Sequence, residues 1–121
     1  MNSITINLPL PPTELSANSR THWAAKAKAV KAYRALAWAA GRAAQTGQPK
    51  RWVKASVKVK AFYRSHNHPD PDNVIASLKA AFDGIADAGV VVNDRGLWPE
   101  RPEISKDAKN PRIELTITEE P

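Results

Sequence analysis

Two aspartates, Asp70 and Asp72, lie two positions apart in the proline-containing stretch PDPDN, residues 69–73. Because fixed carboxylates at this spacing repel each other, the pair is costly unless a cation lies between them or one of them holds a proton. A third aspartate, Asp94, follows a short apolar run. Mg²⁺ prefers oxygen ligands, so these carboxylates and a substrate phosphate would together suit it. The pattern predicts a magnesium site that polarises a phosphoryl oxygen and activates water.

A lysine accompanies these acids on one stripe of an expected helix. Asp72, Ala76, Lys79 and Asp83 are spaced i, i+4, i+7 and i+11, so all four line the same side. Lys79 would stabilise the negative charge that builds up in the transition state. For Asp72 a second interpretation stays open, in which it is the N-cap of this helix. Capping is not expected to explain Asp70.

The segment PDPDNVIASLKAAFDGIADAGVVVND, residues 69–94, resembles the signature of the RusA-type Holliday-junction resolvases. In that family a D-x-D-N at a helix start precedes a K-A-x-x-D run and an acidic pair after an A-G turn. The terminal stretches SITINLPLPP and RIELTITE are similar to the family's terminal strands, so the resemblance covers most of the 121 residues.

The resemblance implies a small homodimeric, Mg²⁺-dependent endonuclease of DNA recombination and repair. Such an enzyme binds four-way DNA junctions by shape and makes paired, symmetric nicks. The matching catalytic and metal-binding acids would be Asp70, Asp72 and Asp94.

Two positions depart from the pattern of this family. Its better-known members carry the lysine one turn after the second acid, where this chain has Ala76. The LKAAFD run arrives three residues later, which makes Lys79 the expected catalytic lysine. Asn93 stands where the family usually has the first of two acids, and Asp94 keeps the second. If the metal site needs both acids, we expect a slow or inactive enzyme.

The charges divide the chain into two parts. Residues 1–69 carry twelve Lys or Arg and one acid, a net charge of +11, whereas residues 70–121 have a net charge of −5. A basic surface attracts nucleic acid, and acids grouped inside a basic protein suggest a cation site near a bound phosphate. The expected DNA-binding residues are Arg20, Lys28, Lys31, Arg34, Lys54, Lys58 and Lys60. For each patch, a merely solvated face is the alternative.

The hydrophobic pattern predicts the elements that position these residues. Alternation predicts strands at residues 3–8, 52–63 and 112–118 and a proline-interrupted strand at residues 97–105. Alanine content and three- to four-residue periodicity predict helices at residues 22–44 and 72–88. The order β-α-β-α-β-β predicts a single α+β domain over residues 1–121, a two-layer fold in which two helices cover a small mixed sheet.

Two of these elements have a clear expected core face. In the first helix this face comprises Ala29, Val30, Tyr33, Leu36 and Ala40. In the long strand it comprises Val53, Ala55, Val57, Val59 and Ala61. The opposite face of the strand carries a lysine ladder, Lys54, Lys58 and Lys60, whose i, i+2 spacing of about 6.7 Å is close to a phosphate repeat.

Composition and length narrow the function classes further. The chain has no cysteine, which excludes disulfides and thiolate metal sites and suits a cytoplasmic protein. No apolar run reaches the ~20 residues of a membrane span, and the N-terminal stretch lacks the features of a secretory signal. A domain of this length has a radius of gyration of about 14 Å, which is too small for one active site to reach two opposed DNA strands. We therefore expect a C2 dimer.

Some alternatives stay open. The dimer surface is expected to involve Trp23, Trp38 or Trp98, on apolarity alone. A non-catalytic nucleic-acid-binding module would use Asp72 as a cap and Asp70 in a surface ion pair. A metal-dependent RNase would use the same acids on a structured RNA.

Overall fold

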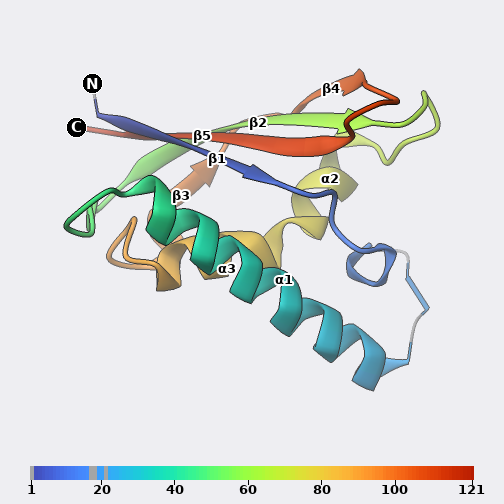
Figure 1. The fold of residues 1–121 in the computed structure, drawn as a ribbon, viewed down its shortest axis with the longest axis horizontal. Helices are drawn as coiled ribbons and strands as arrows, with labels where there is room; N and C mark the ends of the chain where they lie inside the picture. Colours follow the sequence, from blue (N-terminus) through green and yellow to red (C-terminus); the bar gives the residue numbers. More distant parts are fainter. Residues whose placement is uncertain (1, 17–18, 21) are drawn as a thin grey trace.

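The computed structural model describes residues 2–16, 19–20 and 22–121. Its strands are β1 (Ser3–Leu8), β2 (Ala55–Tyr63), β3 (Leu97–Pro99), β4 (Glu103–Lys106) and β5 (Arg112–Glu119). Its helices are α1 (Trp23–Ala44), α2 (Pro71–Ser77) and α3 (Lys79–Asp87), with 3₁₀ turns η1 (Thr13–Leu15) and η2 (Asp94–Gly96). The strands form one layer and the helices cover one side of it (Figure 1). The predicted α+β class with a small mixed sheet is confirmed.

The sheet is built around β2 and β5. Its order is β1-β5-β2-β3, and β4 also pairs with β2. The central strand β5 is antiparallel to both β1 and β2, whereas β3 and β4 run parallel to β2. The short strands β3 and β4 replace the single proline-interrupted strand expected over residues 97–105. This arrangement carries the chain back from α3 through η2 to the edge of β2.

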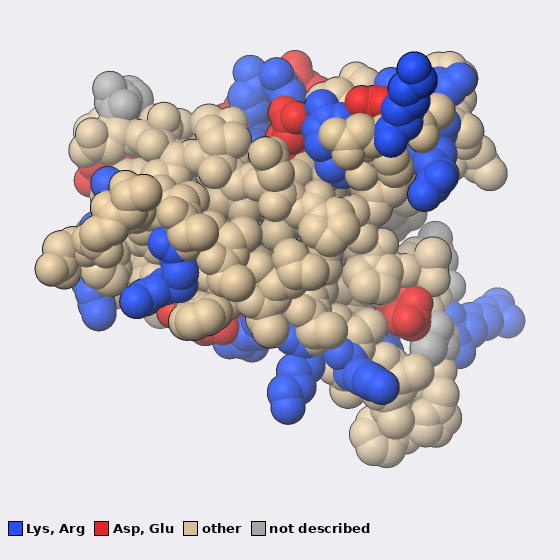
Figure 2. All heavy atoms as spheres, viewed as in Figure 1, with Lys and Arg blue, Asp and Glu red and all other residues tan. Residues whose placement is uncertain are grey.

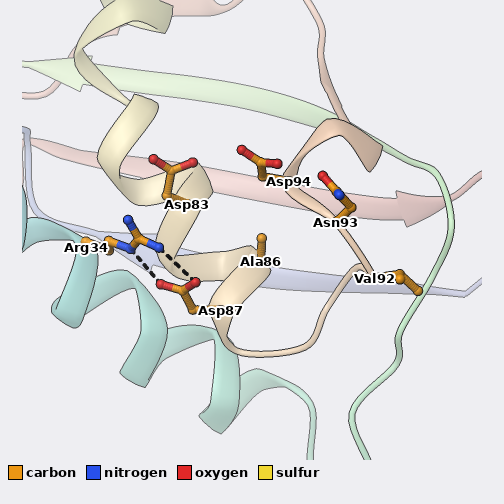
Figure 3. Close-up of a pocket in the computed structure, with 7 residues that line it drawn as sticks. All are labelled: Arg34, Asp83, Ala86, Asp87, Val92, Asn93 and Asp94. Carbon is orange, nitrogen blue, oxygen red and sulfur yellow. Dashed lines mark hydrogen bonds and ion pairs between the residues drawn. The ribbon is translucent and has the colours of Figure 1, made fainter.

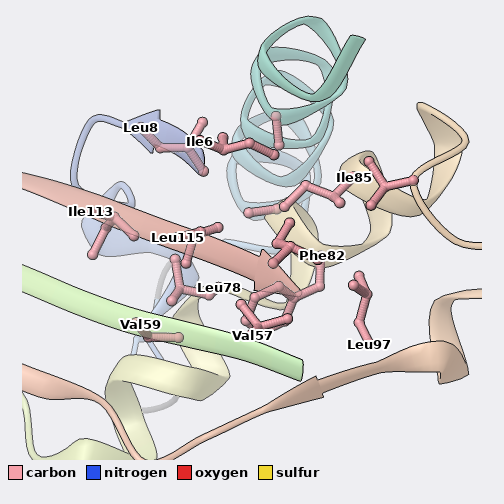
Figure 4. Close-up of a cluster of buried hydrophobic side chains, with 14 of the residues drawn as sticks. Ile6, Leu8, Val57, Val59, Leu78, Phe82, Ile85, Leu97, Ile113 and Leu115 are labelled. Atoms are coloured by element: carbon pink, nitrogen blue, oxygen red, sulfur yellow. The ribbon is translucent and has the colours of Figure 1, made fainter. Parts of the chain in front are cut away.

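The core lies between the helices and one face of the sheet. The three long strands place alternate apolar residues on this face, which matches their predicted alternation. These residues are Ile4, Ile6 and Leu8 of β1, Ala55, Val57, Val59 and Ala61 of β2, and Ile113, Leu115 and Ile117 of β5. Leu78, Phe82 and Ile85 meet them from the helix side (Figure 4). The opposite face of the sheet is mostly polar and also carries Phe62 and Trp98.

Small residues allow α1 and α3 to pack closely. A Cβ atom added at Gly84 would lie 2.2 Å from the backbone oxygen of Arg34 and 3.1 Å from Cβ of Ala37. A Cβ added at Gly41 would lie 3.1 Å from Cβ of Ala88. Glycine inside a helix usually costs about 1 kcal/mol relative to alanine. Here it is required, because any side chain at Gly84 would push the two helices apart.

A buried amide ties the end of α1 to the end of α3. The Gln45 side chain donates to the backbone oxygens of Gly41, at 3.0 Å, and Ala88, at 2.9 Å, and accepts from the Lys50 backbone N–H at 2.8 Å. Gln45 is only 2% exposed, so these three bonds satisfy a polar group that would be costly to bury alone.

None of the helices in the described ranges is long and apolar enough to cross a membrane.

The helix predicted over residues 72–88 is two helices. It bends at Leu78, whose backbone N–H donates to the Ile75 oxygen at 3.0 Å, a tight i to i−3 bond. The Ser77 hydroxyl donates to the backbone oxygen of Val74 at 2.7 Å, which competes with regular helical pairing just before the bend. As a result α2 and α3 run in different directions (Figure 1).

Two residues expected in the core are exposed. Leu36 is 44% exposed because the buried stripe of α1 runs through Tyr33, Ala37 and Gly41 instead. Val53 is 82% exposed because β2 begins only at Ala55. Both core assignments were therefore wrong. Leu36 lies at the border of the apolar stripe of α1, and Val53 lies just before β2.

The buried hydroxyl of Tyr33 leads us to expect that the folded state is less stable at alkaline pH. Its hydroxyl donates to the Pro9 oxygen at 2.7 Å, and burial raises the pKa of Tyr33 above its ordinary value. The folded state therefore favours the neutral phenol, and this contribution falls as the pH rises above about 10, the unfolded pKa. We expect Tyr33→Phe to lose about 1 kcal/mol at pH 7 and to flatten the decline above pH 10. Parallel declines of both proteins in urea denaturation at pH 7, 10 and 11 would contradict this.

Candidate functional site

The structure places Asp70, and not Asp72, at the N-cap of α2. The Asp70 Oδ1 atom accepts the Asn73 backbone N–H at 3.0 Å, and Pro71 occupies the first helical position. Capping therefore explains Asp70, contrary to expectation, because the proline fixes the helix start one residue earlier than predicted. Asp72 lies in the first turn, and its carboxylate makes no hydrogen bond or ion pair with the described residues. Of the three predicted acids, Asp72 is the one without a side-chain contact to the described residues.

The third acid lies close to the expected lysine. Asp94 begins η2, where the Asn93 side chain accepts the Arg95 backbone N–H at 3.0 Å and so caps the turn. The Lys79 Nζ atom donates to Asp83 Oδ1 at 2.7 Å and lies 3.6 Å from Asp94 Oδ2. The bond to Asp83 and the charges of both carboxylates raise the pKa of Lys79, which keeps its ammonium charged.

These groups border one depression between α2, α3 and η2. It has a volume of about 380 Å³ and is lined by the charged residues Lys79, Asp83, Asp94 and Arg95 and by the apolar residues Ile75, Ala76, Phe82, Leu97 and Pro99. Asp72 lies one helical turn before Ala76 on the same face of α2. Ala76, Lys79 and Asp83 therefore stay on one side of the chain across the bend at Leu78, as expected for a common stripe. Asp72 stands at the helix-start end of this stripe.

A second depression, of about 340 Å³, opens on the other side of the same acids (Figure 3). The Asp83 and Asp94 carboxylates point to one side of it, and Arg34 of α1 lies against Asp87 of α3. Arg34 donates to Asp87 through Nε at 2.6 Å and a terminal nitrogen at 2.9 Å. These bonds hold the pKa of Asp87 below its ordinary value and raise the pKa of Arg34. Arg34, a predicted DNA contact, therefore already has an acidic partner.

The donor chemistry of the three predicted acids fits Mg²⁺. All the donors are carboxylate oxygens, and a positive group already lies 3.6 Å from the half-exposed Asp94 carboxylate. This Lys79 ammonium would compete with a metal ion for the Asp94 oxygens. Within the described ranges, however, no three His, Cys, Asp or Glu side chains are gathered closely enough to hold a metal ion.

The basic surface of α1 adjoins the acids. Lys26 lines a depression together with Lys79 and Asp83, and Arg34 lines one together with Asp83 and Asp94. Further along, Lys31 and Arg34 line a shallow hollow that also holds the exposed ring of Trp23. The remaining predicted contacts of this region, Lys28 and Arg20, are exposed. A polyanion lying along α1 would therefore reach the acids.

The lysine ladder lies elsewhere, on the polar face of the sheet. This face points away from the helices, so the structure does not bring the ladder and the acids together. Lys60 is in register with Glu103 of β4 and Glu114 of β5, whereas Lys58 faces Thr116. Figure 2 shows basic side chains mixed with acids along the sheet edge and a separate basic group along the α1 edge. The ladder is thus partly neutralised.

At the other end of the ladder, Lys54 lies over an aromatic ring. The Lys54 Nζ atom lies 4.3 Å from the ring centroid of Trp98, which is 56% exposed on the same face. Among the three ladder lysines, only Lys58 has neither an acidic cross-strand neighbour nor an aromatic ring contact in the described residues.

This difference predicts unequal roles in DNA binding. Lys58→Ala should weaken binding and reduce the slope of log affinity against log salt by about 0.9, the value of one phosphate contact. Lys60→Ala should change the slope less, because its cross-strand neighbours Glu103 and Glu114 lower the positive potential at this position. Fluorescence anisotropy with a labelled four-way junction at several salt concentrations measures both slopes. Unchanged slopes in both variants would remove the ladder from the DNA interface.

Two acids near the site were not among its predicted residues. Asp83 was placed on the correct stripe, and its i, i+4 spacing from Lys79 is the signal for their ion pair. Asp87 gives no comparable local signal, because its partner Arg34 is 53 residues away. Only the small residues at the α1–α3 contact hint that these two helices cross.

Comparison with known proteins finds a relative that matches nearly the whole chain. No protein-family model matches the chain. An uncharacterized protein of Xylella fastidiosa is 35% identical over 127 residues, which cover 98% of this chain and 76% of that protein. The chain belongs to the family of this Xylella protein. Because the match covers nearly the whole chain, residues 70–94 with all the candidate acids lie inside the shared family region.

Proposed function

We propose that this protein is a Mg²⁺-dependent endodeoxyribonuclease of the RusA type that nicks four-way DNA junctions. The observation that carries the proposal is the approach of Lys79 to Asp94, at 3.6 Å, beside a depression lined by Ala76, which follows Asp72 by one helical turn. A lysine and acids from separate elements are thereby grouped at an open surface. The basic surface of α1 leads to the same place.

Separate residues of the chain would bind the metal, contact the reacting phosphate and bind the DNA backbone. Asp94 and Asp72, together with the N-cap Asp70, would hold Mg²⁺, which supplies Lewis-acid chemistry for phosphodiester hydrolysis. Lys79 presents a charged ammonium to the phosphate, where negative charge increases in the transition state. Lys26, Lys31 and Arg34 guide the sugar-phosphate backbone along α1. The resemblance of residues 69–94 to the RusA-type signature supports the same assignment.

A symmetric dimer in the cytoplasm completes the proposal. Paired nicks on opposed strands need two sites, and a C2 dimer of this small domain provides them. Trp23, Trp38 and Trp98 are 76%, 45% and 56% exposed, so each is accessible for a subunit contact. Exposed aromatic rings of this kind are enriched in protein interfaces.

One observation favours a second candidate, a nucleic-acid-binding module without catalysis. Asp70 is used as a helix cap, so one of the three predicted ligands has a structural reason to be present. In this case the basic residues of α1 would still bind nucleic acid, and the acids would only pair with Lys79 and Arg34.

A single cleavage assay separates these functions. Labelled four-way junction, linear duplex and hairpin RNA are incubated with the protein in Mg²⁺ or in EDTA. The proposed function predicts paired nicks in the junction alone, and only with Mg²⁺. Binding without nicking would support the non-catalytic module, and cleavage of the RNA would support a metal-dependent RNase.

A further inference from the structure

Lys79 has two acidic partners at unequal distances. Its Nζ atom is 2.7 Å from Asp83 Oδ1 but 3.6 Å from Asp94 Oδ2. Asp83 follows Lys79 by four residues on the same helix, which is a stable arrangement for an ion pair, whereas Asp94 comes from η2. The Asp83 side chain is 23% exposed and that of Asp94 is 47% exposed. The tighter contact is therefore with the less exposed acid on the same helix.

We propose that Asp83 is a positioning residue that keeps the ion pair of Lys79 with Asp94 at its longer distance of 3.6 Å, so that Lys79 does not close onto that carboxylate. This inference rests on the proposed function, because it concerns a divalent cation bound at Asp94. An ammonium paired directly with Asp94 would compete with such a cation. Held by Asp83, the same ammonium leaves the Asp94 oxygens available and stays near enough to meet a phosphate.

The surroundings of the pair support this division of roles. Asp83 lines two depressions together with Lys79 and two together with residues of α1, so it lies between Lys79 and the basic side chains of α1. If Asp83 lost its charge, Asp94 would be the remaining acid in contact with Lys79 among the described residues. The lysine would then be drawn onto Asp94. Asp83 therefore governs metal affinity through Lys79, and not as a ligand.

A double-mutant cycle on metal binding tests the inference without relying on cleavage. Mn²⁺ alone is titrated into the protein, and free Mn²⁺ is measured by electron paramagnetic resonance. Asp83→Asn should weaken binding about five- to tenfold, within the usual range of coupling between contacting residues. Lys79→Met should strengthen binding. In the Lys79→Met background, Asp83→Asn should change affinity less than about twofold.

Asp87→Asn is the matched control. It removes one negative charge from the next turn of α3, in a depression shared with Asp83 and Asp94, but its partner is Arg34 and not Lys79. It should change Mn²⁺ affinity less than about twofold in both backgrounds. Thermal melts of every variant check that the folds are equivalent.

The outcomes separate this inference from the proposed function. Equal weakening by Asp83→Asn in both backgrounds would show that Asp83 acts by its charge alone and would overturn the positioning role. Unchanged Mn²⁺ affinity in Asp83→Asn would overturn it as well. If the unaltered protein binds no Mn²⁺, or if Asp94→Asn leaves binding unchanged, the metal site fails and the positioning role fails with it.

Discussion

If the proposed nuclease function holds, replacing Asp94 with asparagine should lower the rate of junction nicking by about 10³-fold or more. The reason is that Asp94 would be a ligand of the cation that provides several kcal/mol of transition-state stabilisation, and each 1.4 kcal/mol corresponds to a factor of ten. Stability changes by only about 0.5 kcal/mol, because the Asp94 side chain is half exposed and its contact with Lys79 is a surface ion pair. Gel assays of a labelled junction under single-turnover conditions measure the rate, and urea denaturation measures the stability.

Glu114→Gln is the control for this change. It removes an equal charge from the polar face of the sheet, opposite the helices, and the neutral amide can still accept from Arg112. Nicking by this variant should stay within about twofold of the unaltered protein, as is usual for surface substitutions away from a site. Nicking that survives Asp94→Asn would exclude Asp94 from the catalytic machinery.

Replacing Gly84 with alanine destabilises the protein by more than about 3 kcal/mol, the upper end of the usual cost of overpacking. The added Cβ would lie 2.2 Å from the backbone oxygen of Arg34, and a backbone atom cannot move aside as a flexible side chain can. The helices must separate, which also strains the bonds between Arg34 and Asp87. Urea and thermal denaturation followed by circular dichroism give the loss directly.

Gly41→Ala is the matched substitution at the same helix contact. Its Cβ would meet Cβ of Ala88 at 3.1 Å, which a small shift can relieve, so we expect a loss of about 1 kcal/mol. If Gly84→Ala is no less stable than Gly41→Ala, the close approach of α1 and α3 is wrong. That result would also remove the structural basis for Arg34 lining the acidic depression.

Much of the fold followed from the hydrophobic pattern. The alternation in residues 3–8 and 112–118 predicted β1 and β5 nearly to the residue, because each strand has one buried and one solvated face. The alanine-rich segment 22–44 predicted α1 equally well. The stripe that carries Ala76, Lys79 and Asp83 also held, because those residues stay on one side of the bend at Leu78.

Other features depend on contacts that sequence alone does not reveal. The N-cap moved from Asp72 to Asp70 because Pro71 suits the first helical position, and either acid satisfies the capping preference. The pair of Arg34 with Asp87 exists only because two helices cross at Gly84. The separation of the lysine ladder from the acids follows from the layering, which places the polar face of β2 away from the helices. Distances between layers are not encoded in local periodicity.

Anomalous diffraction from crystals of the protein grown with Mn²⁺ tests the metal site most directly. The proposed site predicts a strong anomalous peak about 2.1 Å from a carboxylate oxygen of Asp94 and from one of Asp72 or Asp70. In the same crystals, Lys79 should remain bonded to Asp83. A peak confined to other residues, or no peak at all with Asp94 still paired to Lys79, would contradict the metal-dependent nuclease.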